Sequence, residues 1–283
     1  PLVYGIYELE QLQPFLDDLY AACEAQGLPV RTAISEYAPG QLELTLEHRF
    51  DALQAIDEGV RYKRLVKGVA NKHGLQACFM AKPFGDQAGS GLHLHVSLAD
   101  EQGNNLYASE DPHGTPLLRH SIGGMLSTLL DSLAIFCPNA NSYRRFQASS
   151  YAPLAKSWGG NNRTVSLRVP GGPAHTRHIE HRICGADANP YLAAAALLAG
   201  IHHGIRQQTD PGAPIVGNGY QQASEFLPTD WLTTLLALER SNWAREALGS
   251  EFIKVFLAIK WHEYRLFTAE VGEQDWRWYL THA

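Results

Sequence analysis

Two patterns in the sequence predict an α+β domain. Segments with the two-residue alternation of strands lie before residue 185, whereas the helical spacing of apolar residues dominates after Pro190. The polar clusters that could carry chemistry also lie in the strand-rich part. The chain has 283 residues, of which 45% are hydrophobic and 18% charged, and this suits one large domain or two small ones. We expect a single catalytic domain over residues 1–283.

Six helices are expected where apolar residues recur at steps of three and four. They span residues 9–23, 52–72, 117–136, 190–208, 231–248 and 251–268. In the first helix leucines form one apolar side, and Gly27 follows its end. Asp51 precedes the second helix as its N-cap, and Gly74 ends it.

Six strands are expected from alternation and from the turn residues around them. They span residues 30–37, 41–47, 76–80, 91–98, 163–169 and 177–184. The fourth alternates leucine and valine against His93, His95 and Ser97. Residues 137–162 have weak periodicity, and so long a loop in a compact domain is usually functional. Residues 210–229 are the one candidate linker.

Charge and composition exclude several classes of protein. Lys and Arg number 23 and Asp and Glu 29, so the net charge is −6, whereas proteins that wrap nucleic acid or coat anionic membranes are usually basic. The longest apolar stretch is too short to span a bilayer, and we expect no secretory signal. Four cysteines without a CxxC pair favour free thiols. We therefore expect a cytoplasmic protein with no nucleic-acid or membrane partner.

Three sets of polar residues lie on the expected strands. They are His93 with His95, His178 with Glu180 and Arg182, and Glu36 with Glu43. Residues two apart on a strand share a face, and a tight turn would bring the two glutamates together. Buried charged rows need a partner, a metal or a charged ligand, although polar rows also occur on solvent-exposed sheet faces. Three carboxylates with one imidazole suit Mg²⁺ or Mn²⁺ rather than zinc.

Six arginines fall within about forty residues of this acidic chain. They are Arg144, Arg145, Arg163, Arg168, Arg177 and Arg182. Guanidinium groups hold carboxylates and phosphates through paired hydrogen bonds, so beside acidic metal ligands the cluster favours phosphoryl transfer. The alternative is a network of surface ion pairs. The sequence contains no P-loop, HExxH or GxSxG motif.

Taken together and in order, these segments resemble the C-terminal catalytic domain of the glutamine synthetase family. The matching segments are residues 36–43, 82–84, 89–98, 141–145, 162–170, 177–182 and 188–191. The resemblance implies a curved, mostly antiparallel sheet packed by helices, followed by a helical C-terminal part. It also implies an N-terminal β-grasp domain ahead of this chain and a ring-shaped homo-oligomer when that domain is present. We therefore expect the 283-residue chain alone to bind metal and ATP poorly.

The resemblance also implies a role for each of these polar residues. The metal ligands would be Glu36 and Glu43 for one Mg²⁺ or Mn²⁺ ion and His93 with Glu180 for a second, two metals per complete site. The contacts to ATP would come from His95, Ser97, Arg163, Arg168 and His178. Glutamate would be held by Gly89, Arg145 and Arg182, with Tyr151 beside the amine, and Arg163 and Arg182 would be catalytic.

The reaction implied by the resemblance is phosphorylation of the γ-carboxylate of glutamate by ATP, followed by attack of an amine. In family members that use ammonia, a loop glutamate binds ammonium, and Tyr151 stands at that position here. A neutral phenol cannot act as that carboxylate, so the sequence favours a glutamate–amine ligase for polyamines or small alkylamines. The alternatives are an ordinary glutamine synthetase in which Tyr151 only packs, a non-catalytic assembly protein of this family and, more remotely, a metal-dependent hydrolase.

Overall fold

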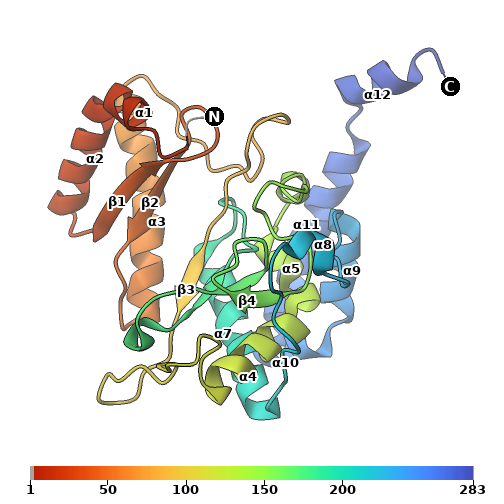
Figure 1. Cartoon of the computed structure of the whole chain (residues 1–283). Helices are drawn as coiled ribbons and strands as arrows, with labels where there is room; N and C mark the ends of the chain where they lie inside the picture. Colours follow the sequence, from red (N-terminus) through yellow and green to blue (C-terminus); the bar gives the residue numbers. More distant parts are fainter. Residues whose placement is uncertain (1–2, 283) are drawn as a thin grey trace.

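The first part of the chain is a small unit in which a β-hairpin packs on two helices (Figure 1). The computed structural model describes residues 3–282, so Pro1, Leu2 and Ala283 of the predicted 1–283 domain lie outside the described residues. The elements of this unit are α1 (Ile6–Gln11), α2 (Gln13–Ala25), β1 (Val30–Ser35), β2 (Leu42–Leu46) and α3 (Ala52–Lys72). One face of the hairpin joins α2 and α3 in a common apolar cluster, which leaves the other face for polar residues.

A four-stranded sheet lies at the centre of the rest of the chain, in the order β3-β6-β5-β4. Its strands are β3 (Leu94–Val96), β4 (Trp158–Gly160), β5 (Leu167–Val169) and β6 (Ile179–His181). β3 and β5 each pair antiparallel with β6, and β4 pairs parallel with β5. The predicted α+β class and the mostly antiparallel pairing are therefore confirmed.

The apolar face of this sheet packs on two helices, α4 (Pro116–Ser127) and α7 (Pro190–Gln207). Val96 lies in one apolar cluster with side chains of both helices. The helices touch each other through glycines, because a Cβ atom on Gly124 would lie 2.2 Å from the carbonyl oxygen of Gly200. A side chain at this point would push the two helices apart.

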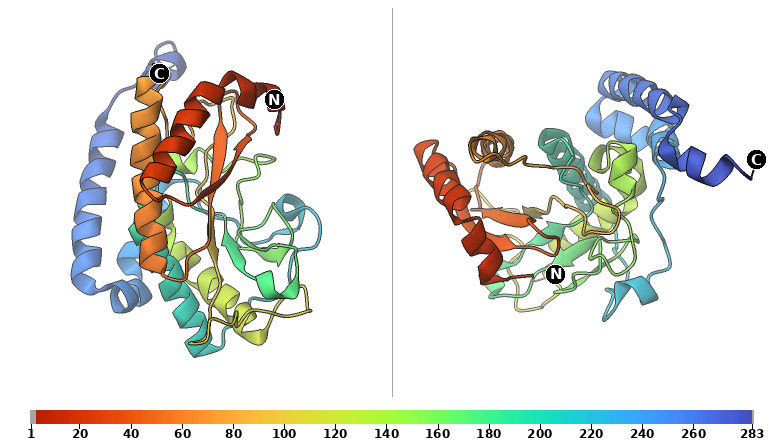
Figure 2. Two further views of the ribbon diagram at one scale, coloured as in Figure 1. Left: turned by 90° about the vertical axis from the view of Figure 1, so that its left-hand side faces the viewer. Right: turned by 90° about the horizontal axis from the view of Figure 1, so that it is seen from above.

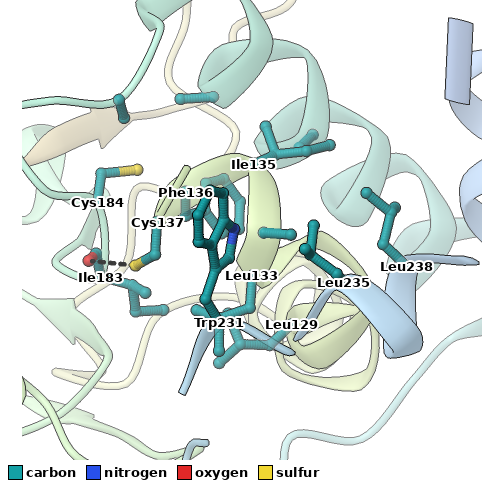
Figure 3. Close-up of a cluster of buried hydrophobic side chains, with 14 of the residues drawn as sticks. Leu129, Leu133, Ile135, Phe136, Cys137, Ile183, Cys184, Trp231, Leu235 and Leu238 are labelled. Atoms are coloured by element: carbon teal, nitrogen blue, oxygen red, sulfur yellow. Dashed lines mark hydrogen bonds between the residues drawn. The ribbon is translucent and has the colours of Figure 1, made fainter. Parts of the chain in front are cut away.

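From α7 onward the chain is mainly helical, as predicted. The remaining elements are α8 (Gly219–Gln222), α9 (Trp231–Arg240), α10 (Asn242–Leu248), α11 (Ser250–Ala269) and α12 (Glu273–Tyr279). α9 packs on α5 (Leu129–Phe136), with Trp231 and Leu235 beside Leu133 in a buried cluster (Figure 3). α12 extends beyond the end of α11, away from the body (Figures 1 and 2). No helix within residues 3–282 is long and apolar enough to cross a membrane.

Three predicted helices are interrupted, each for a local reason. The breaks lie at Leu12, Thr128 and Ser241, within the predicted helices 9–23, 117–136 and 231–248. Pro14, in the first turn of α2, has no N–H group to donate to the preceding turn. The Thr128 hydroxyl donates to the Gly124 carbonyl at 2.9 Å, and the Ser241 hydroxyl caps α10 by accepting from the Ala244 N–H.

The predictions for three non-helical segments were wrong. Residues 76–80 form no strand, and the segment predicted as a loop over 137–162 contains α6 (Ala140–Tyr143) and β4. The segment predicted as a linker, residues 210–229, packs against β4 and is not a free linker. The Ile215 N–H donates to the Trp158 carbonyl of β4 at 2.8 Å. These contacts join segments far apart in the sequence, so local patterns do not show them.

Candidate active site

Three side chains meet across the polar face of the four-stranded sheet. His95 of β3 pairs with Glu180 of β6, and Glu180 pairs with Arg168 of β5. Residues directly opposite in an antiparallel pair point to the same side of the sheet. His93, two residues before His95, reaches the same carboxylate. This register and the contacts of His93, His178 and Arg182 with these residues place the predicted rows on one face.

Glu180 is the centre of the row and is only 2% exposed. Arg182 Nη1 and His93 Nδ1 contact its Oε1 atom, the histidine at 3.3 Å, and Arg168 Nη1 donates to Oε2 at 2.7 Å. Burial alone would raise the pKa of Glu180, but Arg182 and the nearby histidines outweigh burial and lower this pKa to about 2. The carboxylate is therefore ionised, and cationic or polar groups contact both of its oxygens.

The two histidines on the β3 side are neutral near pH 7. Burial, reinforced by Arg182, lowers the pKa of His93 to about 3, and burial also lowers the pKa of His95. His95 Nδ1 lies 3.0 Å from Nε2 of His178, and Ser97 follows two residues later, half-buried. Neutral imidazoles are the form that binds metals and accepts hydrogen bonds.

The β1–β2 hairpin brings two more carboxylates to this site. Glu43 pairs with Ile34 in the hairpin, so Glu36 is its diagonal neighbour on the same face. Partial burial raises the pKa of both carboxyls. Repulsion by Glu43 adds to this rise in Glu36, and repulsion by Glu180 adds to it in Glu43. The site thus gathers negative charge from two separate sheets.

Gly89 lies where the hairpin meets Arg145. Gln41 of the hairpin donates through Nε2 to the Gly89 carbonyl at 3.0 Å. A Cβ atom at Gly89 would lie 2.6 Å from Cγ of Arg145 and 2.7 Å from the carbonyl oxygen of Ala81. Glycine is required because the backbone passes directly against the arginine side chain.

Arg145 is a buried cation that has no counter-ion in the described part of the chain. It is 4% exposed, and its Nη2 group donates to the carbonyls of Ile183 and Cys184, the second at 3.1 Å. Within the described residues no carboxylate reaches ion-pair distance of Arg145, and its Nε atom has no hydrogen-bond partner. An uncompensated buried charge is costly, so this guanidinium marks a place for an anionic ligand.

Arg163 and Arg168 lie closer to solvent. Arg163 is exposed and donates to the Tyr4 hydroxyl at 3.1 Å, and its charge acts to lower the pKa of Glu36 and of Glu43. Arg168 donates through its second Nη group to a side-chain oxygen of Asn161 at 2.6 Å. Both guanidinium groups therefore lie beside carboxylates of this site.

The carboxylates and His93 fit a divalent cation by their chemistry, although residues 3–282 contain no ready-made cluster of three or more His, Cys, Asp or Glu. Three electrostatically coupled carboxylates with a neutral imidazole form a hard, oxygen-rich donor set. The raised pKa values of Glu36 and Glu43 reflect negative charge that a cation would neutralise. Because Arg168, Arg182 and His93 already contact Glu180, a metal bound there would compete with the two arginines for its oxygens.

Residues 2–279 match the family model described as glutamine synthetase, catalytic domain. The chain belongs to the glutamine synthetase family.

Two curated members of this family resemble the chain over almost its whole length. Gamma-glutamylputrescine synthetase PuuA of Escherichia coli (strain K12) is 38% identical over 281 residues, which cover 99% of this chain and 60% of that protein. Gamma-glutamylethanolamide synthetase GlnA4 of Streptomyces coelicolor is 35% identical, over 97% of this chain and 58% of that protein. The chain thus spans about three fifths of the length of these relatives.

Solved structures of the glutamine synthetase family share the fold. The structure titled "Apo GmaS without ligand" superposes with a TM-score of 0.90 at 31% sequence identity. The match covers 99% of this chain and 65% of that one. The predicted family-type catalytic fold is confirmed.

Tyr151 faces Tyr37 at the end of the hairpin that carries Glu36. The two ring centroids are 5.4 Å apart, and the Tyr151 carbonyl accepts from Nη2 of Arg182 at 3.3 Å. Interaction with the Tyr151 side chain, together with partial burial, raises the pKa of Tyr37 to about 12. No sequence motif pointed to Tyr37, although it directly follows Glu36 in the hairpin.

Asp187 was also missed, and it supports the segment that leads to Arg145. Its Oδ2 atom accepts from Asn139 Nδ2 at 2.8 Å and from Ser142 Oγ at 2.7 Å. Asn139 and Ser142 form a capping box at the start of α6, and this pairing is the sequence signal that could have pointed to the site.

Proposed function

We propose that this chain is the catalytic part of an ATP-dependent ligase that joins the γ-carboxylate of glutamate to an amine. The observation that carries the proposal is the buried guanidinium of Arg145, which has no counter-ion among residues 3–282 and lies beside the polar face of a glutamine synthetase-type domain. An uncompensated buried charge destabilises a fold unless a ligand neutralises it. A protein that only builds an assembly has no need of such a group.

Glutamate is assigned to the side of the site near Arg145. The guanidinium would hold the α-carboxylate, because it is buried and no carboxylate of residues 3–282 forms an ion pair with it. Gly89, without a side chain, would let the amino group approach the backbone. Arg182, which contacts both Glu180 and the Tyr151 carbonyl, would hold the reacting end of the substrate.

The polar row is assigned to ATP and to divalent metals, which the family uses generally. Glu36 and Glu43 would hold one Mg²⁺ or Mn²⁺ ion, and His93 with Glu180 a second, so that a complete site has two metals. When bound, the ions withdraw charge from the phosphate oxygens. The nucleotide contacts would come from His95, Ser97 and His178, and the phosphate contacts from Arg163 and Arg168.

In the proposed reaction a γ-carboxylate oxygen of glutamate attacks the γ-phosphorus of ATP, and the bond to ADP breaks. An acceptor that binds as its alkylammonium ion first gives up one proton to water, and the lone pair of the resulting amine then attacks the acyl carbon. Inorganic phosphate leaves with the electron pair of the C–O bond, and the nitrogen loses one proton. Arg163 and Arg182 would be the catalytic residues, because guanidinium groups neutralise the charge that spreads over the transferred phosphoryl group.

The proposed acceptor is a polyamine or a small alkylamine. Tyr151 presents a phenol, and a phenol that is neutral at pH 7 cannot replace a carboxylate as an ammonium ligand. The names of the two relatives specify putrescine and ethanolamide products for those proteins.

The remaining proposals concern the setting in which the chain works. We propose a cytoplasmic protein that forms a ring-shaped homo-oligomer when an N-terminal domain is present. The net charge of −6 supports the absence of nucleic-acid and membrane partners. Light scattering on this chain and on any longer product of the same gene measures the assembly.

Release of phosphate from ATP tests the proposed function. The assay contains L-glutamate and Mg²⁺, compares ammonia, methylamine, putrescine and spermidine, and uses both this chain and any longer product of the same gene. Turnover with an organic amine that exceeds turnover with ammonia supports the proposal. A preference for ammonia identifies an ordinary glutamine synthetase. No turnover from either form contradicts the ligase and favours the non-catalytic assembly protein.

A further inference from the structure

Two large aromatic rings lie together, open to solvent, beside the proposed glutamate site. Tyr37 follows Glu36 in the turn between β1 and β2, and Tyr151 lies in the loop after Arg145. Their ring planes are tilted by 37°. Tyr37 is 36% exposed and Tyr151 46% exposed, so both rings present apolar surface to anything that enters. Because these side chains are not part of the buried core, their pairing needs another explanation.

The backbone holds Tyr151 in an unusual conformation. Its φ angle is +56°, in the left-handed region that residues with side chains rarely adopt. Arg182 donates to the Tyr151 carbonyl, and the Tyr220 hydroxyl donates to the next carbonyl, that of Ala152, at 3.0 Å. A strained residue persists only where its surroundings fix it, and such residues cluster at ligand sites.

The turn that carries Tyr37 is fixed as well. Oε1 of Gln41 accepts from the Ala38 N–H at 3.1 Å, and its Nε2 group donates to the Gly89 carbonyl. Tyr37 is thereby tied to the same loop that passes against Arg145. Both rings are positioned before any ligand binds, and this reduces the ordering cost of binding.

We infer that Tyr37 and Tyr151 form an aromatic wall of the acceptor site and select a primary alkylammonium ion over ammonium. This inference rests on the proposed ligase function. A cation is attracted to the face of an aromatic ring, and both rings expose a face to solvent. The methylene groups of an alkylamine also gain by burial against the rings, a contact that ammonia cannot make. Since the centroids are 5.4 Å apart, the ion binds on the exposed ring faces and not between them.

Amine kinetics with ring-removing variants test this inference. Tyr37→Leu keeps an apolar side chain but loses the π face, Tyr37→Phe keeps the ring, and Tyr20→Leu on α2 is a matched control at a tyrosine that is 37% exposed. We expect Tyr37→Leu and Tyr151→Leu to raise KM for putrescine or methylamine about tenfold, while KM for glutamate and ATP changes less than about twofold. Tyr37→Phe should restore most of the affinity. Equal losses for ammonia and organic amines, or no loss, would overturn the inference.

A binding measurement separates this inference from the fate of the ligase proposal. Calorimetry compares choline with 3,3-dimethyl-1-butanol, two molecules of nearly the same shape of which only choline is charged. We expect the wild-type protein to bind choline more tightly, and Tyr37→Leu to remove the difference. Absence of a preference for choline in the wild-type protein would overturn the aromatic wall. If no amine supports turnover, the ligase proposal fails, and the choline comparison still decides whether the rings bind a cation.

Discussion

Replacing Glu180 by glutamine should strongly destabilise the chain in the absence of ligands. The carboxylate is 2% exposed and contacts Arg168, Arg182 and His93. Its pKa of about 2, against an ordinary value of 4.5, corresponds to about 3 kcal/mol in favour of the charged form in the native state. Glutamine has nearly the same shape, but its NH₂ group meets a guanidinium and leaves buried positive charge without a partner. Removal of one member of a buried ion pair typically costs about 3–5 kcal/mol, in agreement with the first figure.

Urea unfolding at pH 7 with a chelator present measures this loss. Glu251→Gln is the matched control, because Glu251 is 81% exposed and only 3.8 Å from its partner Lys254. The control should change the free energy of unfolding by less than about 0.5 kcal/mol. The difference between wild type and Glu180→Gln should shrink by about 1 kcal/mol at pH 4. A group with a lowered pKa contributes stability above its unfolded pKa and loses it as the pH falls toward the folded value. A loss below about 1 kcal/mol at pH 7 would show that Glu180 does not neutralise the arginines.

Three further outcomes are expected. Gly124→Ala should lower the free energy of unfolding by about 3 kcal/mol, because the new Cβ atom would lie 2.2 Å from the Gly200 carbonyl oxygen. Gly59→Ala in α3 should raise it by about 0.5–1 kcal/mol, because a Cβ atom there meets nothing within 4 Å. Thermal unfolding of both variants checks this pair. Arg145→Lys should raise KM for glutamate about tenfold or more and leave KM for ATP nearly unchanged, and equal effects on both substrates would contradict its assignment. Burial lowers the pKa of His181 to about 3, so below pH 6.5 the unfolded chain takes up a proton that the native state refuses. Stability should therefore fall by about 2 kcal/mol more between pH 7 and pH 5 in wild type than in His181→Phe, and equal slopes would refute this.

The sequence was informative wherever a local period determines which way a side chain points. The alternation over residues 91–98 predicted that His93 and His95 share a face, and the pairing of His95 with Glu180 puts them beside the charged row of β6. The Pro-Gly turn likewise predicted that Glu36 and Glu43 lie close together, and the hairpin register makes them diagonal neighbours. These features depend on strand geometry alone, so they follow from short segments.

The remainder of the fold and site depends on contacts between distant segments. Trp158, Gly159 and Gly160 have no alternation, and they form β4 only because β5 pairs with them in parallel. Nothing in the sequence around Arg145 shows that it is buried, or that no carboxylate among residues 3–282 serves as its counter-ion. The pairing of Tyr37 with Tyr151 joins the hairpin to the loop after Arg145, a contact between distant segments. The residues around Tyr151 do not predict its left-handed backbone conformation.

The contacts of Glu180 connect the proposed metal site to the proposed phosphate site. Without ligands, Arg168 and Arg182 both use this carboxylate as their counter-ion. The same two arginines are the proposed partners of phosphate and of the reacting carboxylate. If a divalent ion takes the Glu180 oxygens, the arginines lose their counter-ion and need another anion. The metal takes Glu180 from the arginines, and a bound phosphate or carboxylate gives the arginines a new anionic partner. Binding of the metal and binding of these anionic substrates should therefore favour each other.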